Sequence, residues 1–179
     1  MTYPQYKEDL QRIHESEVYG KAVFATAARL TRNAERKAKW LKLHALEEET
    51  LSRYLAHMAK TGQAVVEPKA WELKGYAEGM ALGLMPWKLA MRLVRDATGP
   101  FQEKFLRLKQ NSGEDEREFF SYVYAHEKAL EAFAVKELAN EPGSLKAVES
   151  LLARWAAGRA DIPAHYNPDL LTPAHPPGG

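Results

Sequence analysis

The chain has 179 residues, with 25 Lys and Arg residues against 24 Asp and Glu residues, six His and no Cys. This is the length of one domain, long enough to bury a core without cross-links. The lack of Cys excludes disulfides, thiolate metal ligands and a thiol nucleophile. A net charge of +1 argues against a general nucleic-acid binder, which relies on clustered Lys and Arg. No segment is apolar over the length of a membrane span or an export signal, so we expect a cytoplasmic protein without a membrane span.

Proline and glycine mark the ends of the helices expected in the first half of the chain. Apolar residues recur at spacings of three and four over residues 6–31, which predicts a long helix. A break at Arg32 and Asn33 precedes a second helix, which ends at Thr61 and Gly62. A third helix is expected after Pro68, with its stripe reaching Leu89 and with a kink or a restart at Pro86.

The second half begins with an expected stop at Thr98-Gly99-Pro100, a short amphipathic helix over 101–110 and a turn at 111–113. A fourth long helix follows over 114–140, and Ser144 is the expected cap of a last helix that ends before Gly158. Residues 1–158 would thus form one helical domain. Residues 159–179, which hold half of the ten prolines, would form an extended C-terminal tail.

The predicted fold is therefore all-α: an antiparallel four-helix bundle with short accessory helices and an extended tail. Each of the four long helices places a glutamate near the middle of its apolar stripe, and the four are Glu17, Glu47, Glu78 and Glu127. Because such stripes converge in a bundle, the carboxylates would repel one another unless a cation lies among them or some take up protons. Iron or manganese would suit such oxygen ligands.

Histidines lie close to three of these acids. His14 and His44 each precede a glutamate by three residues, and His126 directly precedes Glu127. Residues three apart share a helix face, so an imidazole and a carboxylate could point at one site. An imidazole there could bind metal, orient a carboxylate or carry a proton.

On these residues the chain resembles the ferritin-like superfamily, the di-iron carboxylate four-helix bundles. The resemblance covers roughly residues 6–140 and rests on the four glutamates and on the segments His14-Glu15-Ser16-Glu17, His44-Ala45-Leu46-Glu47 and His126-Glu127-Lys128. It implies two iron or manganese ions and glutamate ligands from the first and third helices at Glu17 and Glu78. It also implies a Glu-x-x-His motif on the second and fourth helices.

The chain departs from this pattern, because Thr50 follows Glu47 by three residues and Leu130 follows Glu127 by three. The resemblance then implies either an altered ligand set or a bundle that has lost its metal. In the altered set, His44 and His126 would substitute for the histidines of the missing Glu-x-x-His motifs. The candidate ligands are seven residues: Glu17, Glu47, Glu48, Glu78, Glu127, His44 and His126. Glu47 and Glu48 define adjacent stripes, so the sequence does not decide which of them points inward.

The alternative interpretation places these acids on the surface, in ion pairs with Lys and Arg. It is preferred for Glu78, which has no neighbouring histidine, whereas the shared polar core is preferred for Glu17 and Glu127. Two functions follow. One is a metal-dependent oxidase or oxygenase, in which the metals bind and reduce dioxygen. The other is a non-catalytic bundle that associates with a partner or with itself as a homo-oligomer, with Gly75, Gly79 and Gly83 as one contact surface.

Overall fold

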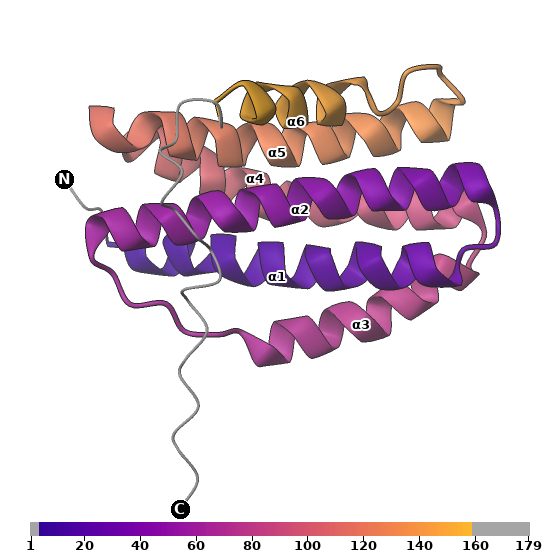
Figure 1. Cartoon of the computed structure of the whole chain (residues 1–179), viewed down its shortest axis with the longest axis horizontal. Helices are drawn as coiled ribbons and strands as arrows, with labels where there is room; N and C mark the ends of the chain where they lie inside the picture. Colours follow the sequence, from indigo (N-terminus) through magenta and orange to yellow (C-terminus); the bar gives the residue numbers. More distant parts are fainter. Residues whose placement is uncertain (1–3, 159–179) are drawn as a thin grey trace, which may run out of the picture.

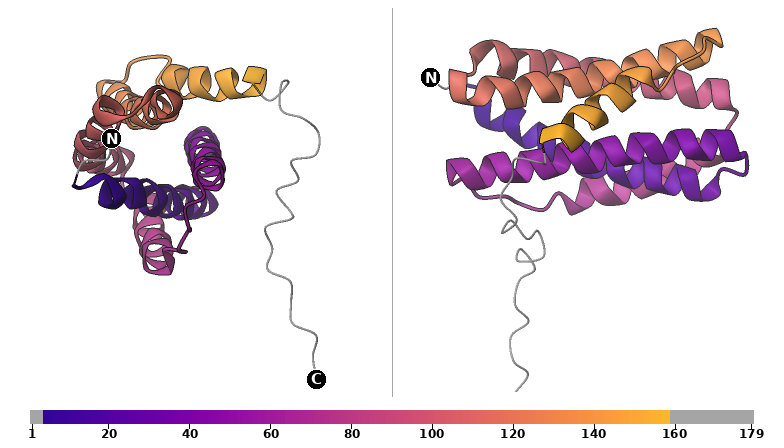
Figure 2. Two further views of the ribbon diagram at one scale, coloured as in Figure 1. Left: turned by 90° about the vertical axis from the view of Figure 1, so that its left-hand side faces the viewer. Right: turned by 45° about the horizontal axis from the view of Figure 1, so that its top comes forward.

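The computed structural model describes residues 4–158, with side chains up to Ala153, and the proline-rich tail lies outside this range. The described part is all-α and contains no strand. Its helices are α1 (Tyr6–Leu30), α2 (Ala34–Thr61), α3 (Lys69–Leu84), α4 (Trp87–Asn111), α5 (Glu114–Ala139) and α6 (Lys146–Gly158). The helices α1 and α2 lie side by side, as do α4 and α5, while α3 covers the outer side of α1 (Figures 1 and 2).

The ends of α2 have the expected local chemistry. The Asn33 side chain accepts a hydrogen bond of 2.9 Å from the backbone N–H of Arg36 and caps the first turn. At the other end Gly62 takes a left-handed conformation with φ 67°, which favours a residue without a side chain. The expected boundaries of α1, α2 and α5 are confirmed to within one residue, and Pro86 restarts the chain as α4 after α3 ends at Leu84.

The expected stop at Thr98-Gly99-Pro100 is wrong, because α4 continues through Pro100 to Asn111. Gly99 has no Cβ to clash with the proline ring, so the helical conformation before Pro100 is tolerated. Thr98 is buried, and its hydroxyl donates to the backbone carbonyl of Arg95 at 2.8 Å. Buried residues on both sides of the proline, Val94 and Phe105, belong to the packed interior, so packing outweighs the lost backbone hydrogen bond.

The last helix begins two residues after Ser144, but its expected cap is replaced by another contact. The Ser144 hydroxyl donates to a carboxylate oxygen of Glu137 at 2.5 Å. Glu137 also accepts from the Trp87 indole at 2.8 Å and pairs with Lys39 at 2.8 Å. This carboxylate therefore links α2, α4, α5 and the loop before α6.

The glycines of α3 form its contact with α1. A Cβ atom on Gly75 would lie 2.6 Å from the backbone oxygen of Tyr19, and one on Gly79 would lie 2.5 Å from that of Val23. A Cβ on Gly83 would lie 2.9 Å from the backbone oxygen of Ala27. The ridge therefore allows a close helix approach, as predicted, but it is covered by this chain's own α1. It is not free for a partner.

Two apolar clusters fill the interior on either side of a polar layer. One contains Trp40 and Phe133, and the other contains Ile13, Phe105 and Phe120. Within the described residues no helix has the length and apolarity that a membrane span requires.

Replacing Gly79 by Leu should force α3 away from α1, because its Cβ would meet backbone rather than a movable side chain. We expect the free energy of unfolding, measured by chemical denaturation, to fall by at least about 2 kcal/mol. Ala77→Leu introduces the same side chain on the exposed face of α3 and should change stability by less than about 0.5 kcal/mol. Equal effects of the two substitutions would contradict the close approach.

Candidate metal centre

A cluster of buried polar side chains lies between α1, α2 and α5. Glu17, Glu47 and His126 are 0%, 3% and 1% exposed. The Nδ1 atom of His126 lies 3.6 Å from Oε2 of Glu17, and its Nε2 atom lies 3.4 Å from Oε1 of Glu47. One ligand atom from each of the three residues lies within 4.8 Å of the other two. These residues could therefore share one small cation.

Thr50 fixes the orientation of the His126 ring. The Thr50 hydroxyl lies 2.6 Å from Nδ1 of His126 and donates to the backbone carbonyl of Leu46 at 3.0 Å. Since a hydroxyl has a single proton, Nδ1 of His126 donates to Thr50 while that bond holds. The other nitrogen, Nε2, then carries a lone pair on the side of Glu47 and has no hydrogen-bond partner. An imidazole held by one nitrogen with the other free is the usual arrangement of a metal-binding histidine.

The absence of a side chain at Gly20 makes room for Glu47. A Cβ atom on Gly20 would lie 2.5 Å from both Cδ and Oε2 of the Glu47 side chain. The carboxyl group of α2 therefore rests directly on the backbone of α1. Glu48, the neighbouring residue, points outward and pairs with Lys21 at 3.2 Å. This settles which of the two adjacent glutamates is inward.

Burial dominates the electrostatics of the cluster. It raises the pKa of Glu47 to about 8 and raises that of Glu17 well above its usual range. The pKa of Glu127 is also raised well above its usual range by burial, and the charges of Glu17 and Glu47 add to the effect. His126 opposes these shifts at Glu17 and Glu127. Without a cation, the carboxyl groups thus retain protons in a pH range where exposed glutamates are charged.

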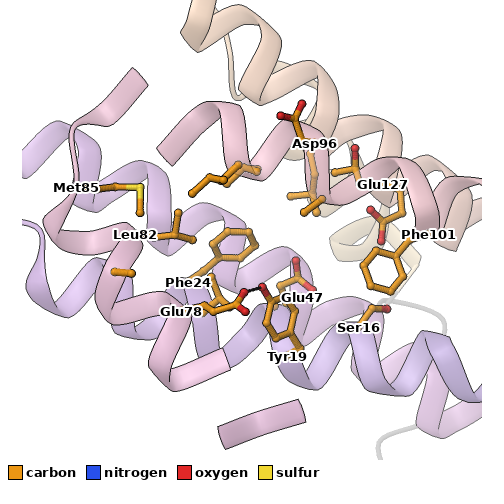
Figure 3. Close-up of a pocket in the computed structure, with 18 residues that line it drawn as sticks. Ser16, Tyr19, Phe24, Glu47, Glu78, Leu82, Met85, Asp96, Phe101 and Glu127 are labelled. Carbon is orange, nitrogen blue, oxygen red and sulfur yellow. Dashed lines mark hydrogen bonds between the residues drawn. The ribbon is translucent and has the colours of Figure 1, made fainter. Parts of the chain in front are cut away.

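Glu127 lies beside the three-residue cluster and faces a pocket. The pocket has a volume of about 480 Å³ and is bounded by α1, α3, α4 and α5, with Glu47 from α2 at its inner end. Figure 3 shows the carboxyl groups of Glu47 and Glu127 inside it and Glu78 next to Tyr19. No hydrogen bond or ion pair holds the Glu127 carboxylate among residues 4–153, although the side chain is 4% exposed.

The remaining candidates from the sequence lie outside the cluster. Glu78 is half-exposed on α3, accepts a hydrogen bond from the Tyr19 hydroxyl and pairs with Lys74 at 3.7 Å. This placement agrees with the surface interpretation preferred for Glu78, which does not join Glu17, Glu47 and His126 because α3 packs on the outside of α1. His44 is 21% exposed and faces Glu48 at 3.7 Å rather than the cluster.

Two residues of the site had a visible but incomplete signal in the sequence. Thr50 occupies the position, three after Glu47, where the ferritin-like pattern has histidine, yet only the structure brings it against His126 of α5. Gly20 follows Glu17 by three and so lies on the same face of α1, but its role depends on the Glu47 side chain from another helix. The roles of Thr50 and Gly20 depend on contacts between helices, which the spacing of residues along one helix does not predict.

Comparison of the chain with protein-family models, with curated proteins and with solved structures finds no match. The site is therefore interpreted from its own geometry.

The metal-free protein should lose stability as the pH rises from 5 to 8. The pKa of Glu47 is about 8 in the folded state, against about 4.3 in an unfolded chain, so the folded state holds a proton that the unfolded state has lost. Linkage then requires the free energy of unfolding to fall with pH in this window. Denaturation curves at pH 5, 6.5 and 8 in the presence of a chelator measure this fall.

The Glu47→Gln variant is the control, since Gln keeps the shape of a protonated carboxyl group and does not titrate. The pH-dependent fall should be smaller in the variant by a few kcal/mol. The pKa values of His14 and His57, which burial lowers, act in the opposite direction in both proteins and cancel in the comparison. An identical pH dependence in the two proteins would show that Glu47 ionises freely.

Proposed function

We propose that this chain is a ferritin-like antiparallel bundle of α1, α2, α4 and α5 that binds one iron or manganese ion between Glu17, Glu47 and His126. With that ion it would act as a metal-dependent oxidase or oxygenase. The observation that carries the proposal is the cluster of three buried ligand groups with ligand atoms within 4.8 Å of one another. Two of its atoms, Oε2 of Glu17 and Nε2 of His126, have no hydrogen-bond partner among the described residues.

The donor set fits a divalent ion in charge and in type. Two carboxylates and a neutral imidazole carry two negative charges, which one divalent cation neutralises. Burying carboxylates without such a partner is costly. Oxygen-rich sites with one imidazole suit iron or manganese better than the softer sites that select copper or zinc.

One ion fits the residues better than the two that the family resemblance implies. In the proposed bundle α4 would take the place of the third helix of the ferritin-like pattern, but its one carboxylate at the pocket, Asp96, is exposed on the open side and does not belong to the cluster. Glu78 and His44 do not belong to the cluster, and among the described residues Glu127 is the further buried acid whose pKa is affected by the charges of both Glu17 and Glu47. A second ion would therefore have a single strong ligand.

The chain's own residues provide the remaining requirements of such a site. Thr50 holds His126 with Nε2 toward Glu47, and Gly20 lets the Glu47 carboxyl group approach α1. Burial of all three ligands shields them from bulk solvent except where Glu47 lines the pocket. A bound iron or manganese ion supplies electron transfer to dioxygen, and the pocket gives a second reactant access to the Glu47 side of the cluster.

The second candidate function, a non-catalytic bundle that associates with a partner or with itself, is favoured by one observation. The outer face of α3 exposes an apolar stripe of Leu73, Tyr76, Met80 and Leu84 at helical spacing. The glycine ridge does not serve this function, because α1 covers it.

Metal titration of chelator-treated protein tests the proposal. Manganese(II) or anaerobic iron(II) should bind with one equivalent per chain, and affinity should rise with pH because metal displaces protons from Glu17 and Glu47. Glu47→Gln and Gly20→Ala should each weaken binding at least about tenfold. Glu48→Gln, at the exposed neighbouring position, should leave binding unchanged. Protein that binds no metal at pH 8, or equal loss in the Glu48→Gln variant, would overturn the proposal.

A further inference from the structure

The pocket beside the proposed metal centre is mainly apolar, and its polar lining residues are four acids and the hydroxyl-bearing Ser16, Tyr19 and Thr98. Its walls are formed chiefly by side chains such as Phe24, Leu82, Val94, Phe101 and Leu130. A volume of about 480 Å³ lies within the range of small-molecule sites, about 300–1,000 Å³. Its open side is lined by exposed residues of α3 and α4, namely Ala81, Leu93 and Ala97. A ligand that fills this space has a predominantly hydrocarbon body.

Every charged residue that lines the pocket is acidic. Glu78 and Asp96 are exposed on the open side, and Glu47 and Glu127 are buried at the inner end. No Lys, Arg or His is among the lining residues. Glu78 and Asp96 are paired with Lys74 and Arg95, so the acids at the inner end decide which head group is favoured. A carboxylate or phosphate group would meet repulsion there, whereas a cation would not.

Glu127 is the group within the pocket that lacks a partner. It projects from α5 into the cavity (Figure 3), is 4% exposed and forms no hydrogen bond or ion pair within residues 4–153. Glu47 differs, because it rests on Gly20 and faces Nε2 of His126. No group within the described residues donates a hydrogen bond to the Glu127 carboxyl group, and an ammonium group supplies up to three N–H donors together with a positive charge.

We infer that this pocket binds an apolar primary amine, with its hydrocarbon body against α1, α3 and α4 and its ammonium nitrogen at the Glu127 carboxylate. Glu127 is not one of the three proposed metal ligands, although Glu47 lines the pocket as well as the cluster, and amine binding does not require the ion. The amine site therefore extends the proposed function by a ligand class. No metal-dependent reaction of that ligand is proposed.

Calorimetric titration of the chelator-treated full chain at pH 7.5 with octylamine, 1-octanol and octanoate tests the inference. The three probes share a chain and differ in the head group, which is cationic, neutral and anionic. Octylamine should bind at least about tenfold more tightly than 1-octanol, and octanoate should bind more weakly than both. Octanoate or 1-octanol binding as tightly as octylamine would overturn the inference.

Three variants locate the binding. Glu127→Gln should reduce octylamine affinity at least about tenfold, to the level of 1-octanol. Glu131→Gln, one turn further along α5 and outside the pocket, should leave it unchanged. Ala97→Trp, at an exposed lining position, should weaken octylamine and 1-octanol together. Unchanged octylamine binding in Glu127→Gln or in Ala97→Trp would overturn the inference, and circular dichroism verifies that each variant is folded.

The outcome is independent of the metal proposal. If the protein binds octylamine through Glu127 but takes up no iron or manganese, the amine site is supported and the metal proposal is overturned. If the protein binds metal but shows no preference for octylamine, the metal proposal is supported and the amine site is overturned.

Discussion

The arrangement of this protein depends on carboxyl groups enclosed between helices. Glu17, Glu47 and Glu127 come from three helices and are almost fully buried. Each would be charged in water at neutral pH, and enclosing such charges costs several kcal/mol unless protons or a cation compensate. The features around them reduce that cost: a glycine that admits the Glu47 carboxyl group and an imidazole held by Thr50. The residues around these acids therefore make their burial less costly.

The acidic layer has two sides with different chemistry. Toward α1 and α2, two glutamates and His126 converge within the dimensions of a single ion's coordination shell. Toward α3 and α4, Glu127 meets an apolar pocket. The same negative charge can thus attract a metal ion on one side and an organic cation on the other, and the two apolar clusters of the core isolate this layer from the ends of the bundle.

The sequence predicts the helices better than their arrangement. Periodicity, proline and glycine locate most boundaries, because these signals are local. The stop expected at Gly99 and Pro100 fails because tertiary packing holds both halves of α4 in one helix. The position of α3 on the outer side of α1 follows from contacts between its glycines and the α1 backbone. Likewise, Glu47 and Glu48 are separated by about 100° of rotation about the α2 axis, and only the packing of α2 decides which of them faces inward. The approach of His126 to Glu17 and Glu47 requires three helices to meet.

Diffraction from crystals of the full chain grown at pH 8 with manganese(II) shows directly whether the buried acids hold a cation. Data collected above and below the manganese absorption edge give an anomalous difference map. We expect one strong peak within about 2.0–2.3 Å of carboxylate oxygens of Glu17 and Glu47 and of Nε2 of His126. A map with no peak at these atoms, with manganese bound only at exposed acids or not at all, would contradict this expectation.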